Sequence, residues 1–187
     1  RMFPASAFTP KESLPLLDVP LLTHLILEAK AAGVERLHVV TSPSKSFDTL
    51  LEDRSALHAH RNHLDSTLFH ATEGLEVFTH LQHEPKGVGN ALEAALDAVS
   101  GPILVMLGDN LLMDTHASVE HYAASQASKR LVEAFAATGE ATVGLMEVEP
   151  TSVSNYGIVA VNDGRVVEVV EKPAPEDAPS RLAMCGR

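Results

Sequence analysis

Asp109 is the residue whose position in the sequence points most directly to phosphate chemistry. It follows the apolar run at residues 103–107 after a single glycine, Gly108. An apolar run without alternation is typical of a strand covered on both faces, and a carboxylate at its end is poorly solvated unless a cation meets it. Mg²⁺ is the usual cation for such a carboxylate in phosphate chemistry. Asp109 could equally cap a helix or close a turn, so its position alone leaves both roles open.

A glycine-containing segment at residues 82–89 is the second candidate. It starts at Gln82 and joins an expected strand to an expected helix. Gly87 and Gly89 would let a ligand approach the backbone, and a helix N-terminus favours anions. Glycines at a strand-to-helix turn also serve the turn itself, so both interpretations stay open.

Charged residues near the two ends of the sequence are further candidates. Glu171 and Lys172 end the last expected strand, where the acid could accept sugar hydroxyls and the lysine could meet a phosphate. They could also form a solvated ion pair that contributes only about 0 to 1 kcal/mol. Lys11 stands at an expected loop-to-helix boundary, and Arg1 is the first residue of the sequence.

The histidines and the cysteine favour no metal site or nucleophile. His58, His60 and His63 are two and then three residues apart, whereas two imidazoles on one helix face need a four-residue step. We expect them to be solvated surface residues. Cys185 has no base near it in the sequence, and no Gly-x-Ser-x-Gly motif is present, so nucleophilic catalysis is not supported.

The elements that must position the candidates alternate between helix and strand. The apolar periodicity predicts helices at 20–32, 47–70, 87–99 and 118–137, and strands at 37–40, 75–81, 103–107 and 141–148. Residues 156–161 and 165–170 flank Asn162-Asp163-Gly164, a strong hairpin signal. This order predicts an α/β fold with a mostly parallel sheet and an antiparallel hairpin near the C-terminal end.

Composition limits the partners. The 187 residues carry 14 Lys and Arg against 25 Asp and Glu, a formal net charge of -11, so we expect no nucleic acid and no membrane surface as a partner. No apolar run approaches the length of a membrane span. The single cysteine excludes an intramolecular disulfide framework and fits a reducing compartment, so we expect a cytoplasmic protein.

Six ordered motifs together resemble the UTP:glucose-1-phosphate uridylyltransferases, which are members of the sugar nucleotidyltransferase family. They lie at residues 1–5 with 10–21, 82–89, 107–109, 156–159, 170–173 and 178–183. Residues 41–53 also look more like the uridylyltransferase branch, whereas Gly108-Asp109-Asn110 is frequent in thymidylyltransferases. The resemblance spans nearly the whole chain.

The resemblance implies a Rossmann-like sheet sandwiched by helices and a set of site residues. It implies nucleotide-phosphate contacts for Arg1 and Lys11, nucleobase contacts for Gln82 and Gly87, a Mg²⁺ ligand at Asp109, hexose contacts for Gly157 and Glu171, and a sugar-phosphate contact for Lys172. Arg1, Lys11 and Lys172 would then be the catalytic cations. Residues 1–187 would form a single nucleotidyltransferase domain that lacks the glycine-rich loop and strand before Arg1 and a C-terminal part.

The reaction that the resemblance implies is attack of a glucose 1-phosphate oxygen on the α-phosphorus of UTP. The products would be UDP-glucose and pyrophosphate, with Mg²⁺ as cofactor, no covalent enzyme intermediate, and a homodimer or homotetramer as the assembly. Two alternatives remain: a glucose-1-phosphate thymidylyltransferase and a non-catalytic sugar-nucleotide-binding homologue.

Overall fold

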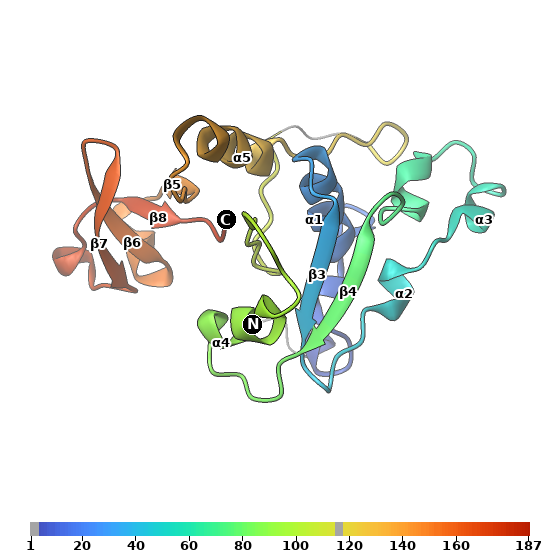
Figure 1. The fold of residues 1–187 in the computed structure, drawn as a ribbon, viewed down its shortest axis with the longest axis horizontal. Helices are drawn as coiled ribbons and strands as arrows, with labels where there is room; N and C mark the ends of the chain where they lie inside the picture. The colour runs from blue at the N-terminus through green and yellow to red at the C-terminus, as the bar shows by residue number, and fades with distance from the viewer. Residues whose placement is uncertain (1–3, 115–117) are drawn as a thin grey trace.

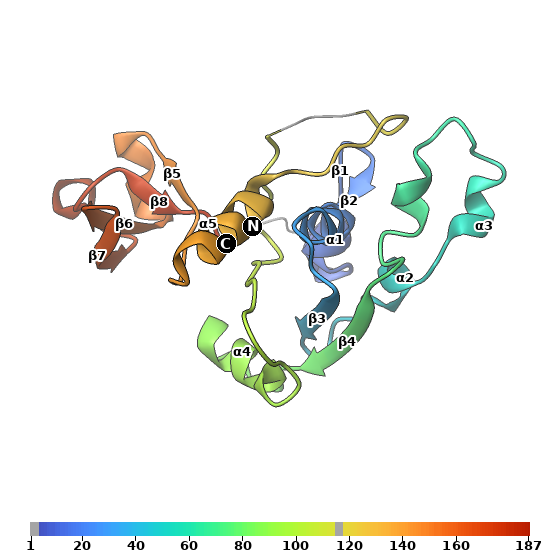
Figure 2. The ribbon, with the colours of Figure 1, turned by 45° about the horizontal axis from the view of Figure 1, so that its top comes forward.

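In Figure 1 an antiparallel sheet forms one end of the molecule, and a parallel strand pair lies on the other side, with the chain that joins its two strands beyond it. The computed structural model describes residues 4–114 and 118–187. The parallel pair is β3 (Arg36–Thr41) with β4 (Glu76–Leu81), and the antiparallel sheet has the order β5-β8-β6-β7. In both views helix α5 (Ala127–Thr138) lies between that sheet and α1 (Leu21–Ala31), against which it packs (Figures 1 and 2). The predicted α/β class with an antiparallel hairpin is confirmed.

Helix α1 forms where its sequence predicts it. It begins after Pro20 and ends before Gly33, which has a φ of 84°. The amide of Gly33 bonds to the Lys30 carbonyl and the amide of Val34 to the Ala29 carbonyl, which is the Schellman pattern. The confirmed boundaries therefore come from local chemistry at each end of the helix.

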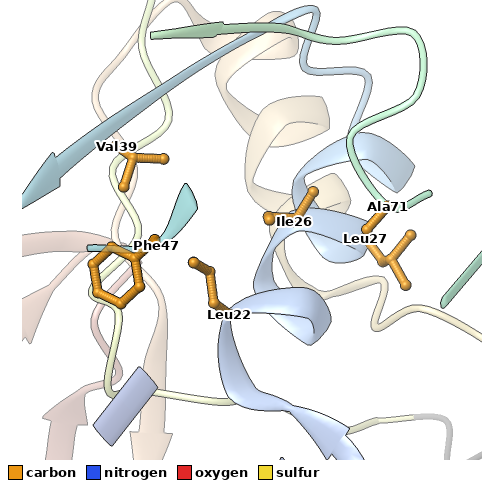
Figure 3. Packing of buried hydrophobic residues seen from close by; sticks show 6 residues of the cluster. All are labelled: Leu22, Ile26, Leu27, Val39, Phe47 and Ala71. Atoms are coloured by element: carbon orange, nitrogen blue, oxygen red, sulfur yellow. The ribbon is translucent and has the colours of Figure 1, made fainter. Parts of the chain in front are cut away.

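The main hydrophobic core lies between α1 and β3. Its buried members come from α1, β3 and the chain between β3 and β4: Leu22, Ile26, Leu27, Val39, Phe47 and Ala71 (Figure 3). A second cluster sits within the antiparallel end and contains Val153, Ile158 and Ala183. Each end of the molecule thus has its own apolar centre.

The connection from β3 to β4 differs from the predicted helix at 47–70. It forms only α2 (Asp48–Leu51), α3 (Ser55–His58) and a 3₁₀ turn (Ser66–Phe69). Asp53 accepts a hydrogen bond from the Ser55 amide and Asp65 accepts one from the Thr67 amide. These local side-chain bonds offer the backbone an alternative to a continuous helix, which is why the prediction of one helix was wrong.

The predicted strand at 103–107 was also wrong. No described segment forms a ladder with these residues, and Ile103 is half exposed. The Leu107 amide instead donates to the Gly186 carbonyl at 3.0 Å. A strand needs a continuous ladder of hydrogen bonds to a neighbour as well as an apolar sequence, and within the described residues this run forms no ladder.

The C-terminal hairpin matches its prediction. Strands β6 (Gly157–Asn162) and β7 (Arg165–Glu171) are antiparallel, and Asp163 and Gly164 both have positive φ, as a type I′ turn requires. The predicted strand at 141–148 shortens to β5 (Leu145–Glu147). β8 (Leu182–Met184), which pairs with both β5 and β6, is too short to give a periodic signal.

Several short elements complete the description. They are α4 (Val88–Leu96), the hairpin of β1 (Pro15–Leu16) and β2 (Val19–Pro20), and the 3₁₀ turns Ala5–Ala7, Lys11–Ser13, Pro150–Asn155 and Pro175–Asp177. None of the helices built from the described residues has the length and apolar character to cross a membrane.

A carboxylate marks the beginning of α5. The expected helix at 118–137 starts only at Ala127, and Asp114 accepts a hydrogen bond from the Gln126 amide at 3.1 Å. Asp114 also pairs with Arg130 at 2.8 Å. Desolvation works against ionisation of Asp114, but the hydrogen bonds from Arg130 and Gln126 outweigh it and lower its pKa to about 2.

Stability should depend on this carboxylate in acid. Because the folded-state pKa of Asp114 lies below its ordinary 3.8, the ionised group stabilises the fold above about pH 4, and that contribution is lost as the pH falls toward about 2. Urea titrations across this range should give a free energy of unfolding that falls less steeply in Asp114→Asn than in the wild type. If the free energy of unfolding fell equally steeply with pH in both proteins, the proposed contribution of the ionised Asp114 carboxylate would be contradicted.

Candidate functional site

Gln82 and Gly87 lie in direct contact where β4 gives way to α4. The Gln82 side-chain amide donates to the Gly87 carbonyl at 3.1 Å and to the Asn90 side chain at 2.9 Å. Gly87 precedes α4 with a φ of 99°, a conformation that side chains rarely adopt. The two predicted nucleobase residues are therefore brought together, and Asn90, in the first turn of α4, was not anticipated.

An open depression of about 480 Å³ adjoins this contact. It is lined by the end of β4, the turn after it and one face of α4: Leu81, Gln82, His83, Glu84, Lys86, Asn90, Glu93 and Ala94. Two of these residues are apolar and the other six are polar or charged, so the depression offers several hydrogen-bonding groups to a ligand.

Lys11 and Asp109 form an ion pair with 2.5 Å between Lys11 Nζ and Asp109 Oδ2. Lys11 opens the 3₁₀ turn after Pro10, and Asp109 sits in the turn closed by the Asn110 amide on the Leu107 carbonyl. The side chains of Lys11 and Asp109 are 39% and 49% exposed, so both can reach a ligand. The structure thus joins two residues that are 98 positions apart.

A second ion pair adjoins the first. Lys45 Nζ lies 3.1 and 3.3 Å from the two carboxylate oxygens of Glu12, and a Cβ added to Gly108 would be 3.4 Å from Glu12 Cγ. Two cations and two acids therefore gather around the Gly108 turn. The sequence contained both residues within the motifs, but nothing in their spacing connected Glu12 with Lys45.

The donors near Asp109 fit a metal that arrives with phosphates. Residues 4–114 and 118–187 hold no group of three or more metal-ligating side chains, so they form no all-protein cage. Mg²⁺ is commonly bound by one or two carboxylates, with waters and substrate phosphates completing the shell. Asp109 supplies such a carboxylate, and its Oδ1 has no described hydrogen-bond partner.

Gly157, Glu171 and Lys172 meet at the open end of the β6–β7 hairpin. Gly157 is opposite Glu171, and a Cβ on Gly157 would be 2.7 Å from Met184 Cε and 3.1 Å from Glu171 Oε2. Lys172 has a φ of 47°, and its amide donates to the Tyr156 carbonyl at 3.0 Å. Lys172 Nζ and Glu171 Oε1 are 3.1 Å apart and both side chains are exposed.

The predicted residues therefore fall into three local groups. They are Gln82 with Gly87, Lys11 with Asp109, and the group on the hairpin that ends at Lys172. Within residues 4–114 and 118–187 no hydrogen bond or ion pair joins one group to another. The eighth predicted site residue, Arg1, lies outside the described residues.

The histidines and the cysteine behave largely as the sequence indicates. His60 and His63 are exposed, while His58 is half-buried and its Nε2 contacts the Leu64 carbonyl at 2.9 Å. Burial raises the pKa of the Cys185 thiol, which disfavours the reactive thiolate.

A match between a family model and almost the whole chain shows the family to which the chain belongs. The family model described as nucleotidyl transferase matches residues 1–186. The chain belongs to the nucleotidyl transferase family. This membership agrees with the resemblance of the sequence motifs, and the family usually uses a divalent metal ion.

Individual relatives of the chain carry more specific names. A UTP–glucose-1-phosphate uridylyltransferase of Streptococcus pyogenes is 35% identical over 200 residues, which cover all of this chain and 64% of the relative. The chain thus spans less than two thirds of the length of that curated relative.

Solved structures resemble the chain over all 187 residues. An apo UDP-glucose pyrophosphorylase has a TM-score of 0.80 at 27% identity, with all of this chain and 70% of that chain covered. A UTP-bound enzyme of the same kind from Acinetobacter baumannii has a TM-score of 0.79 at 25% identity, with 100% and 68% covered.

Close packing at Gly157 generates a prediction. Gly157→Ala places a methyl group against the terminal methyl of Met184 and the terminal carboxylate of Glu171, so these two flexible side chains must move off their preferred rotamers and the free energy of unfolding should fall by about 0.5 to 1.5 kcal/mol. Gly89→Ala is the matched control, because it lies within α4 with open space around it and should stabilise by about 0.5 to 1 kcal/mol. Urea unfolding measures both. A Gly157→Ala protein as stable as the wild type would contradict the packing.

Proposed function

We propose that this protein forms UDP-glucose and pyrophosphate from UTP and glucose 1-phosphate with Mg²⁺ as cofactor. The observation that carries the proposal is that residues expected to bind the same part of a substrate contact one another. Gln82 and Gly87, expected at the nucleobase, are hydrogen-bonded, and Glu171 and Lys172, expected at the sugar phosphate, form an ion pair. The names of the streptococcal relative and the pyrophosphorylases support the same substrates.

Base recognition would rest on Gln82. Both N–H groups of its amide have partners, one in the Gly87 carbonyl and one in Asn90, which leaves the Gln82 carbonyl oxygen to accept a hydrogen bond. The N3–H of a uracil is a suitable donor. Thymine presents the same edge, so this contact does not by itself separate UTP from dTTP.

Charge neutralisation would be the task of the cations. Reacting phosphates must approach closely, and unit charges 4 Å apart repel by about 1 kcal/mol in water and by more in a drier site. Lys11 is exposed enough to turn from Asp109 to a phosphate oxygen. Arg1 is proposed as a further cation for the nucleotide phosphates. Asp109 would hold Mg²⁺, which when bound neutralises charge on the triphosphate.

The sugar phosphate would be held at the hairpin. The exposed Glu171 carboxylate can accept hydrogen bonds from sugar hydroxyls, and Lys172 offers a mobile ammonium beside it. Gly157 keeps this corner free of a side chain that would displace Glu171. Attack of the phosphate oxygen on the α-phosphorus then requires positioning more than covalent chemistry from the protein.

We propose further that the protein is a homodimer or homotetramer of the cytoplasm. Val167 and Val169 on the edge strand β7 are 62% and 54% exposed, an apolar surface that favours self-association. The lone cysteine, which is buried and unpaired, is compatible with a reducing compartment.

Pyrophosphate release from UTP and glucose 1-phosphate tests the reaction. Asp109→Asn should lower kcat by about 10²-fold or more, because a carboxylate that anchors the cation is lost. Lys172→Ala should raise KM for glucose 1-phosphate by about 10- to 100-fold and change KM for UTP less.

The control for the lysine is Arg165→Ala, an exposed cation on the same hairpin that pairs with Glu140 and should leave both constants unchanged. Wild-type turnover in Asp109→Asn would refute the proposed role of that carboxylate. Faster turnover with dTTP than with UTP would favour the thymidylyltransferase alternative, and binding of UDP-glucose without pyrophosphate release would favour a non-catalytic homologue.

A further inference from the structure

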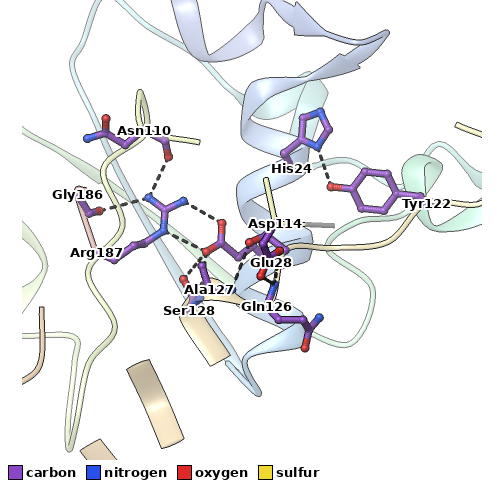
Figure 4. Close-up of polar contacts among 11 residues, drawn as sticks. His24, Glu28, Asn110, Asp114, Tyr122, Gln126, Ala127, Ser128, Gly186 and Arg187 are labelled. Carbon is purple, nitrogen blue, oxygen red and sulfur yellow. Dashed lines mark hydrogen bonds and ion pairs between the residues drawn. The ribbon is translucent and has the colours of Figure 1, made fainter. Parts of the chain in front are cut away.

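A fully buried ion pair joins Glu28 of α1 to Arg187 (Figure 4). The guanidinium makes two contacts with the carboxylate, at 2.8 Å from Arg187 Nη2 to Glu28 Oε2 and 3.2 Å from Nε to Oε1, and both side chains are 0% exposed. Ser128, in the first turn of α5, donates its hydroxyl at 2.6 Å and its amide at 3.2 Å to the same carboxylate. Both oxygens of the Glu28 carboxylate therefore accept hydrogen bonds, and its charge is balanced by that of Arg187.

Stability alone is a weak reason for such a pair. Removing two charges from water costs several kcal/mol per ion, and well-packed apolar residues often replace a buried pair without loss of stability. What apolar residues cannot replace is the set of directed hydrogen bonds that Arg187 makes to other groups. Those bonds indicate what the pair does.

The remaining hydrogen bonds of the Arg187 guanidinium lead to the Asp109 turn. Arg187 Nη1 donates to the Asn110 carbonyl at 2.9 Å and to the Gly186 carbonyl at 3.3 Å. The Gly186 carbonyl also accepts the Leu107 amide at 3.0 Å. The residue after Asp109 and the residue two before it are thus both tied to the same short segment.

Gly186 makes this attachment close. It has a φ of 70°, and a Cβ built on it would be 2.3 Å from the Asn110 side-chain nitrogen. A larger residue would be strained and would push Asn110 away. The close contact between Gly186 and Asn110 therefore restricts where the turn at residues 107–110 can lie relative to the buried Glu28–Arg187 pair.

We propose that Glu28 and Arg187 are positioning residues that hold the turn at residues 107–110 and thereby orient the Asp109 carboxylate. The functional part of this inference rests on the proposed function, in which Asp109 binds the cation. The Glu28 carboxylate fixes the orientation of the Arg187 guanidinium, and the guanidinium in turn holds the Asn110 carbonyl by a hydrogen bond. Both side chains are fully buried, so neither is placed to touch a substrate itself.

The test uses a double variant that leaves no unpaired buried charge. Glu28→Gln keeps an acceptor for Ser128, and Arg187→Met removes the cation together with its bonds to Asn110. Amide hydrogen exchange in the peptide covering residues 103–112 should become at least about tenfold faster, while amides of β3 keep their rates. The Mg²⁺ concentration for half-maximal turnover should rise by about tenfold, with a smaller change in KM for UTP.

Two further variants keep the test decisive. Arg187→Lys retains the charge without the planar fork and should give intermediate exchange, and it replaces the double variant if that protein does not fold. Removing the exposed pair by Arg165→Ala with Glu140→Ala should leave residues 103–112 unchanged. Wild-type exchange of the turn in the variants at Glu28 and Arg187 overturns the proposal. Failure of the wild type to release pyrophosphate counts against the proposed function alone.

Discussion

The buried bond between Glu28 and Arg187 is the interaction on which the arrangement of the molecule depends. It connects residues 159 positions apart, and Ser128 adds a third segment 100 positions from Glu28. Through it, α1, the start of α5 and the segment that follows β8 share one polar centre between the two apolar clusters. The carboxylate also faces the N-terminal turn of α5, where the helix dipole favours a negative charge.

The candidate site, in contrast, consists largely of charged residues that are exposed to solvent. The charged side chains of this site are exposed or half-exposed and form ion pairs in contact with solvent: Lys11 with Asp109, and Glu171 with Lys172. Their positions come from element ends and turns, which the apolar clusters and the buried pair hold in place. A buried, well-bonded interior beneath exposed charges suits chemistry in which anionic substrates must enter, be neutralised and leave.

The features that were predictable from the sequence are those determined by residues close to one another in the chain. α1 has its apolar stripe with Pro20 and Gly33 at its ends, and the β6–β7 hairpin has Asp163-Gly164 at its turn. Contacts between distant positions were not predictable in this way. Nothing local indicates that Glu28 meets Arg187 or that Glu12 meets Lys45, and the apolar run at 103–107 showed hydrophobicity but not a partner strand. Asp109 was predicted as a site residue because it follows that run, although the strand on which the prediction rested is not formed in the described residues.

A double-mutant cycle on the free energy of unfolding tests the central role of the buried pair most directly. Glu28→Gln alone leaves the Arg187 charge buried without its partner, and Arg187→Met alone does the same to Glu28, so each should cost about 3 to 5 kcal/mol. The double variant should recover much of this loss, because no unpaired charge remains. Losses that simply add in the double variant would contradict a coupled pair at the centre of the fold.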